Sequence, residues 1–166
     1  MTCKYLFLLL VALIVGPGWL HASVAPGKEA LCEKDASALA HEGKLDEGLA
    51  AIRKCIKSSP SRAKAHVVLG YILLKKGEGQ QAITSFDKAL ELRPRSSAAK
   101  TGKGIVLAQG GNLKEAESIL KDALKLNPDP ARTYYELGLI YEQLGDAEQA
   151  LSHFKQGITT REQEKR

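Results

Sequence analysis

Aromatic residues are scarce in this chain of 166 residues: they make up 5% of the sequence, with a single Trp. Leu and Ala supply most of the apolar content instead. Sandwiches and barrels build their cores from aromatic and β-branched residues, whereas Leu and Ala are strong helix formers. The composition therefore favours an all-α fold.

Signatures of catalysis and of metal binding are also missing. The sequence holds no G-x-S-x-G element, phosphate-binding loop or dinucleotide fingerprint. His41, His66 and His153 lack the i, i+4 pairing and the nearby cysteines of a zinc site. We therefore expect no enzyme activity, no cofactor and no metal. The net charge of +5, from 24 basic and 19 acidic residues, is too balanced to indicate nucleic-acid binding.

The longest apolar run is short, covering residues 5–15 between Lys4 and the helix-breaking Gly16 and Pro17. As a helix this run spans about 16 Å, roughly half the apolar thickness of a bilayer. Such a layout is typical of a signal peptide. We predict a signal peptide over residues 1–22, cleaved after Ala22, a linker over residues 23–28, and a periplasmic or secreted protein. The alternative is an uncleaved segment that anchors the chain in the membrane.

The rest of the chain repeats with a constant period of 34 residues, which glycines and prolines mark. The equally spaced glycine column consists of Gly43, Gly77, Gly111 and Gly145, and the proline column, with the same spacing, of Pro60, Pro94 and Pro128. Glycine accepts the positive φ that closes a helix, and proline cannot continue one. Each unit is therefore predicted to be a helix hairpin, and the units must stack because one hairpin cannot bury its apolar face alone.

Capping residues support this division into hairpins. Asn112 and Asp146 are predicted to cap the second helices of the third and fourth units through their side chains. Asp129, which precedes Pro130, is predicted to start the first helix of the fourth unit.

The columns of small and large residues resemble those of the tetratricopeptide repeat (TPR) family, in which one repeat is about 34 residues long. The second unit matches with Leu69, Gly70, Leu73, Gly77, Ala82, Phe86, Ala89 and Pro94, and the fourth with Tyr134, Leu137, Gly138, Tyr141, Gly145, Ala150 and Phe154. The resemblance implies an all-α, right-handed superhelical solenoid of four TPR hairpins, over residues 29–62, 63–96, 97–130 and 131–164. Asp35 and Lys103 depart from the pattern, because Leu is expected at their positions.

The resemblance also implies that the first helices of successive repeats line a concave groove for segments of partner proteins. By the period, the predicted groove residues are Lys64, Val67, Tyr71, Leu74, Thr101, Ile105, Arg132, Tyr135, Leu139 and Glu142. An apolar strip flanked by Lys64 and Arg132 suits a segment with hydrophobic side chains and an acidic group. Tyr71 and Tyr135 are the preferred candidates, since aromatic side chains concentrate binding energy at interfaces. Packing between repeats is the alternative role for the apolar members, Leu74 and Leu139 above all.

Two further features bear on partners. Some family members bind chaperone carboxylates through Lys and Asn in the groove, but Glu33, Ser37 and Val68 occupy matching positions here, so a role as a chaperone cofactor is not expected. Many family members also end in an additional solvating helix, which is not expected over residues 159–166. Leu151 and Ile158 are therefore predicted to be exposed, in a surface for self-association or for docking on a larger complex.

The cysteines predict a covalent link in the first repeat. Cys3 leaves with the signal peptide, so the exported chain keeps Cys32 and Cys55, an even number in an oxidising compartment. Nearly equal stretches of chain separate them from the turn at Gly43, which places them level on antiparallel helices. We predict a disulfide between Cys32 and Cys55. Two buried thiols, or a thiol-active redox pair, are the alternatives.

These observations together predict an exported TPR adaptor or scaffold that binds segments of partner proteins in its groove. A membrane-tethered accessory subunit of an envelope assembly or secretion complex is the alternative, and contact with a membrane is expected only if the N-terminal segment is uncleaved. A redox protein that uses Cys32 and Cys55 is a third, less favoured interpretation.

Overall fold

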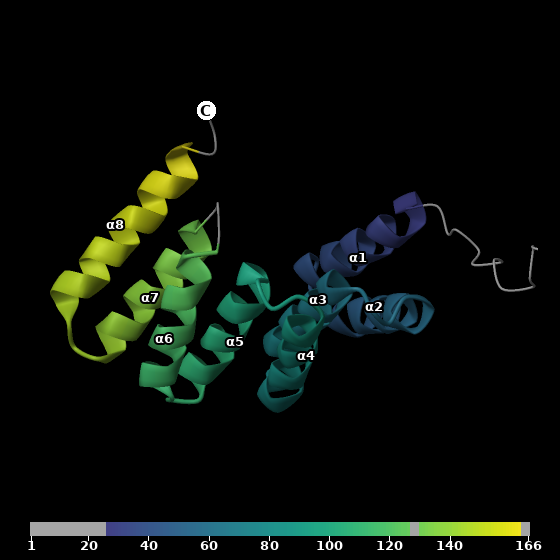
Figure 1. Ribbon diagram of the computed structural model, residues 1–166, viewed down its shortest axis with the longest axis horizontal. Helices are drawn as coiled ribbons and strands as arrows, with labels where there is room; N and C mark the ends of the chain where they lie inside the picture. Colours follow the sequence, from purple (N-terminus) through teal and green to yellow (C-terminus); the bar gives the residue numbers. More distant parts are fainter. Residues whose placement is uncertain (1–25, 127–129, 164–166) are drawn as a thin grey trace, which may run out of the picture.

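The computed structural model describes residues 26–126 and 130–163, which form α-helices without strands. The helices are α1 (Pro26–His41), α2 (Leu45–Ser58), α3 (Ala63–Lys75), α4 (Gly79–Leu92), α5 (Ser97–Gln109), α6 (Leu113–Leu124), α7 (Ala131–Gln143) and α8 (Ala147–Gln163). They pair into four hairpins, which stack from α1 and α2 at one end to α7 and α8 at the other (Figure 1). The predicted all-α solenoid of four helix hairpins is confirmed.

The glycine column forms the turns inside the hairpins. Gly43, Gly77, Gly111 and Gly145 have φ values of 83°, 79°, 80° and 78°. After each glycine, the next residue donates its N–H to the carbonyl oxygen five positions earlier, as Lys44 does to Leu39 at 2.9 Å. This is a glycine-terminated helix end that satisfies a free carbonyl of the first helix.

Small residues let large side chains pack between helices. The fully buried ring of Phe86 lies against Gly70 of its own hairpin and Gly102 of the next hairpin. A Cβ atom at either glycine would overlap this ring. Gly138 and Phe154 repeat the arrangement in the last hairpin. The apolar core therefore runs continuously through the stack, as expected for repeats that cannot bury their apolar faces alone.

The capping predictions have mixed outcomes. Asp146 Oδ1 accepts the N–H of Gln149 at 3.0 Å, as predicted. Asn112 precedes α6 but makes no side-chain cap bond, so that prediction was wrong; its ψ of 57° is not the extended backbone in which a cap side chain reaches back over the first turn. Ser96 caps α5 instead, accepting from Ala99 at 3.3 Å. Asp129 lies outside the described residues.

The two charged departures from the apolar pattern lie where their charges are solvated or paired. Asp35 is exposed on α1. Lys103 is half-buried, and its Nζ lies 2.7 Å from Oδ1 of Asp87 on α4. Neither charge enters the core, which would cost far more than exposing an apolar position.

Within the described ranges, no helix is both long and apolar enough to cross a bilayer. The predicted signal peptide over residues 1–22 lies outside those ranges.

Candidate binding groove

The first helices of the four hairpins enclose a cavity of about 640 Å³. Its walls come from α1, α3, α5 and α7, and they are mostly apolar with a few charged side chains. The lining residues are Ser37, Ala40, His41, Val68, Tyr71, Ile72, Leu74, Lys75, Ile105, Gln109, Arg132, Glu136 and Leu139. An apolar concavity with a few polar groups is the usual form of a binding site.

Tyr71 is held in this cavity by contacts on three sides. Its hydroxyl donates to the carbonyl oxygen of Ala98 at 2.9 Å. Its ring packs edge-on against Phe86, with centroids 5.1 Å apart and an interplanar angle of 75°. The guanidinium carbon of Arg132 lies 4.6 Å from its ring centroid. Burial raises the pKa of the phenol, so Tyr71 stays neutral at physiological pH.

Arg132 brings a positive charge to the cavity. Its side chain is exposed, and its Nε lies 3.8 Å from Oε1 of Glu136, too far for a direct hydrogen bond. Burial raises the pKa of Glu136, an effect that Arg132 opposes. Lys75 adds a second cation and donates from Nζ to the carbonyl oxygen of Ala40 at 3.1 Å. Among the described residues, the lining therefore carries a Lys, an Arg and one carboxylate.

Half of the predicted groove residues line this cavity: Tyr71, Leu74, Ile105, Arg132 and Leu139. Val67 and Thr101 are buried between repeats instead, and Thr101 Oγ1 lies 2.9 Å from Oγ1 of Thr133 on α7. Lys64 and Glu142 are exposed outside it. Tyr135 lies elsewhere, at the last hairpin.

Tyr135 contributes to a second cavity, of about 750 Å³, on the last hairpin. The lining residues are Ala131, Arg132, Tyr135, Glu136, Phe154, Gly157, Ile158 and Arg161. The rings of Tyr135 and Phe154 have centroids 5.5 Å apart. Arg132 and Glu136 line both cavities, so the two are neighbours along α7.

The predicted set contained no residue of the first repeat, yet α1 forms one wall of the groove. Ser37, Ala40 and His41 all line the cavity. The period contained this signal, because Ser37 lies one period before Tyr71 and Ala40 lies one period before Leu74.

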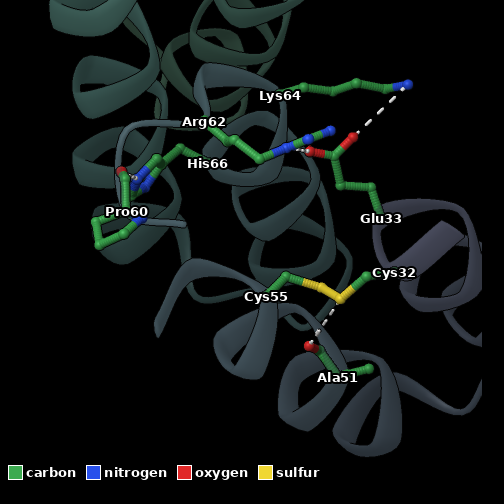
Figure 2. Close-up of polar contacts among 8 residues, drawn as sticks. All are labelled: Cys32, Glu33, Ala51, Cys55, Pro60, Arg62, Lys64 and His66. Carbon is green, nitrogen blue, oxygen red and sulfur yellow. Dashed lines mark hydrogen bonds and ion pairs between the residues drawn. A yellow bond between two sulfur atoms is a disulfide. The ribbon is translucent and has the colours of Figure 1, made fainter. Parts of the chain in front are cut away.

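Two sets of contacts attach α1 to its neighbours (Figure 2). The sulfur atoms of Cys32 on α1 and Cys55 on α2 are joined as a disulfide, and their Cα atoms are 6.2 Å apart. Glu33, whose side chain is buried, accepts from Arg62 Nε at 2.8 Å and lies 3.7 Å from Lys64 Nζ. Because Arg62 precedes α3 directly, these contacts hold the α1 wall of the groove against both α2 and α3.

Hairpins that recur with one fixed period, closed by positive-φ glycines and stacked around a groove of first helices, define a tetratricopeptide repeat solenoid. The family model for the cytochrome c-type biogenesis protein H TPR domain matches residues 28–164, and the chain belongs to this family. No curated protein matches the sequence.

Solved structures share the fold. PilF of Pseudomonas aeruginosa is 23% identical, with a TM-score of 0.71 over 80% of this chain and 60% of that one. A thermophilic TPR protein of Thermus thermophilus is 24% identical, with a TM-score of 0.74 over 81% of this chain and 75% of that one. MamA from MSR-1 is 26% identical, with a TM-score of 0.60 over 82% of this chain and 78% of that one.

Proposed function

We propose that this protein is an exported adaptor that holds segments of partner proteins in the cavity between α1, α3, α5 and α7. The observation that carries the proposal is the cavity itself, in which apolar walls surround the exposed Arg132. The ring of Tyr71 supports its guanidinium group, so little conformational freedom is lost when Arg132 binds.

The chemistry of the lining favours a segment with aliphatic side chains and a carboxylate. Leu74, Ile105 and Leu139 offer apolar contacts, and Arg132 offers the planar donor pair that suits a carboxylate. Among the described residues that line the cavity, Glu136 is the one that carries a carboxylate, and burial favours its neutral form. The balance of charge therefore attracts an acidic segment over a basic one.

Export is supported by the signal-like layout of residues 1–22 and by the family, whose name refers to cytochrome c biogenesis. Cytochrome c maturation proteins are therefore one class of partner to examine. Membrane tethering through an uncleaved N-terminal segment is the alternative, favoured by the apolar run at residues 5–15. The mass of the N-terminal peptide of the purified protein separates the two: a start at Ser23 supports cleavage, and a start at Met1 supports tethering.

In-cell crosslinking tests segment binding. A photoreactive amino acid at Leu139 reports on the groove, and the same amino acid at the exposed Lys114 of α6, outside both cavities, is the matched control. We expect crosslinked partner segments from position 139 and few from position 114. Identical capture at both positions contradicts groove binding.

The segment identified by crosslinking is then synthesised as a peptide. We expect the purified protein to bind it, and replacement of its carboxylates by amides to weaken binding about tenfold. Unchanged affinity for the amide peptide removes the acidic-segment chemistry while leaving groove binding in place.

A further inference from the structure

Large exposed hydrophobic side chains gather at the two ends of the solenoid within the described ranges. At one end, Leu151 and Ile158 on α8 are 71% and 61% exposed, and Tyr135 on α7 is 53% exposed. At the other end, Leu31 on α1 is 57% exposed. Figure 1 shows α1 and α8 at opposite ends of the stack. Leu144, at the turn before α8, is also exposed.

The repeat explains why these positions are apolar. The positions equivalent to Leu31 in the later repeats are Ala65, Ala99 and Thr133, and all three are buried. The positions equivalent to Leu151 are the buried Leu49, the half-buried Ile83 and the half-buried Glu117, whose carboxylate is paired with Lys121. Leu31 and Leu151 therefore occupy columns that neighbouring repeats cover inside the array.

We propose that α1 of a second copy docks on α7 and α8, in the place that the first helix of a following repeat would occupy. The copies then associate head to tail. The second cavity, with Tyr135, Phe154 and Ile158 in its lining, receives the docked helix. The docked helix belongs to the same structural type as α3, α5 and α7, each of which packs on the hairpin before it.

A contact inside the array shows which apolar residues meet. Thr101 on α5 and Thr133 on α7 touch, with their hydroxyl oxygens 2.9 Å apart. One repeat further along, Tyr135 takes the place of Thr101. In the docked copy, Leu31 takes the place of Thr133. Two exposed apolar side chains, one from each end, are thus brought together and removed from water.

A second contact inside the array supplies charge complementarity. Lys103 on α5 reaches back to Asp87 on α4, with 2.7 Å between Nζ and Oδ1. Two repeats further along, Lys155 takes the place of Asp87, and Asp35 of the docked copy takes the place of Lys103. The acidic and basic residues have exchanged places relative to Lys103 and Asp87, so the two charges of the docked pair are still opposite. This pairing gives a reason for an acidic residue at position 35, where the repeat pattern favours Leu.

A symmetric dimer through two copies of α8 fits these observations less well. It brings Lys155 of both copies into one interface, and it leaves Leu31 and Asp35 uncovered. The head-to-tail arrangement covers both ends and pairs their charges. The docking surface is the second cavity, whose lining shares Arg132 and Glu136 with the groove. Asp35 and Lys155 line neither cavity, so variants at these two positions test the association separately from segment binding.

Charge reversal in the purified protein tests the proposal by sedimentation equilibrium. Asp35 and Lys155 are both exposed, so their variants are expected to keep the helical circular dichroism of the wild type. We expect the apparent mass of the wild type to rise with concentration. Asp35→Lys and Lys155→Asp each place like charges at the interface and are expected to raise the dissociation constant about tenfold. Lys114→Asp, the same charge change outside the interface, is expected to leave it unchanged.

Combining the two charge reversals tests whether Asp35 and Lys155 pair directly. The double variant Asp35→Lys with Lys155→Asp restores opposite charges and is expected to associate within about twofold of the wild type. A mixture of the two single variants is expected to regain association, with both variants present in equal number.

Three results overturn the proposal. The first is a wild type that stays monomeric up to the concentration limit of the measurement. The second is a response to Lys155→Asp without a response to Asp35→Lys, which indicates the symmetric dimer or another occupant. The third is a double variant as weak as the single variants.

Discussion

The guanidinium carbon of Arg132 on α7 lies 4.6 Å from the ring centroid of Tyr71 on α3. The second and fourth repeats therefore touch across the concave face, over the α5 helix that separates them in the chain. The contact buries part of the Tyr71 ring and leaves the Arg132 side chain exposed at the groove. A cation held over an aromatic face in this way is positioned for an anionic ligand.

Replacement of Arg132 by Gln is expected to weaken binding of an acidic groove segment about tenfold, because a charged donor pair is lost. The measurement is titration of the segment and its amide analogue against both proteins. We expect the variant to bind the two peptides with similar affinity, whereas the wild type prefers the acidic one. Equal loss of affinity for both peptides contradicts a specific pairing between Arg132 and the carboxylate.

Tyr71→Phe keeps the ring and removes the hydroxyl that donates to Ala98. We expect the free energy of unfolding to fall by about 1 kcal/mol, the typical contribution of one such hydrogen bond. Urea denaturation followed by circular dichroism measures this change. Tyr71→Ala also removes the contacts with Phe86 and Arg132, so its loss is expected to be larger, at about 3 kcal/mol or more. Equal losses in the two variants contradict the packing role of the ring.

The disulfide between Cys32 and Cys55 is expected to stabilise the first hairpin by about 3 kcal/mol in the chain-entropy model. The double variant Cys32→Ala with Cys55→Ala tests this by urea denaturation with and without a thiol reductant. Ala already occupies the positions equivalent to Cys55 in the second and third repeats, as Ala89 and Ala123, so the substitution leaves little unfilled space there.

We expect the reductant to destabilise the wild type and to leave the double variant unchanged. Two results contradict a structural disulfide. One is a wild type whose stability does not change with the reductant. The other is the detection of two free thiols in protein isolated from an oxidising compartment.

Gly138→Ala is expected to destabilise the protein by about 1–3 kcal/mol, because the new Cβ overlaps the ring of Phe154. The overlap outweighs the helix propensity gained on replacing Gly by Ala, which is at most about 1 kcal/mol. Gly110→Ala is the matched control. Its φ is −80° and its Cβ meets only ordinary contacts, so a change within about 1 kcal/mol is expected. Similar losses at the two positions contradict the close-packing explanation.

His153 makes stability depend on pH. Its ring stacks between Tyr134 and Tyr141, with centroid distances of 6.0 and 5.2 Å, and burial lowers its pKa from 6.5. Gln156, through a side-chain hydrogen bond, and the nearby Glu117 oppose this lowering of the pKa, whereas Lys121 adds to it. The folded state thus favours neutral imidazole, so the unfolded chain binds the proton first as the pH falls.

We expect the wild type to lose stability as the pH falls through 6.5, the ordinary pKa of the imidazole, until the folded state is protonated as well. His153→Gln is expected to lose less stability than the wild type over this pH range. Urea midpoints at a series of pH values provide the measurement. If the stability of His153→Gln falls with pH as steeply as that of the wild type, the pH dependence does not come from His153.

The hairpin turns and the tight contacts of Gly70 and Gly138 followed from the period of the repeat, because each depends on the size or the backbone freedom of one residue type. The groove followed only in part. Val67 and Thr101 share the repeat pattern of Tyr135. The repeats that follow them bury Val67 and Thr101, whereas Tyr135, on the last described hairpin, is exposed. The cap at Asn112 failed for a local reason, its ψ angle, which residue type does not determine.

The repeat period was enough to predict an array of four helix hairpins. A positive-φ turn, a helix stop and a column of small residues are local requirements, and each leaves a mark at a fixed spacing. Which faces of the array remain exposed became clear from the packing of the hairpins in three dimensions. Exposure depends on the angle at which one hairpin packs on the next, and on contacts such as Arg132 with Tyr71 between residues far apart in the chain. The spacing of residues in the sequence does not specify that packing angle.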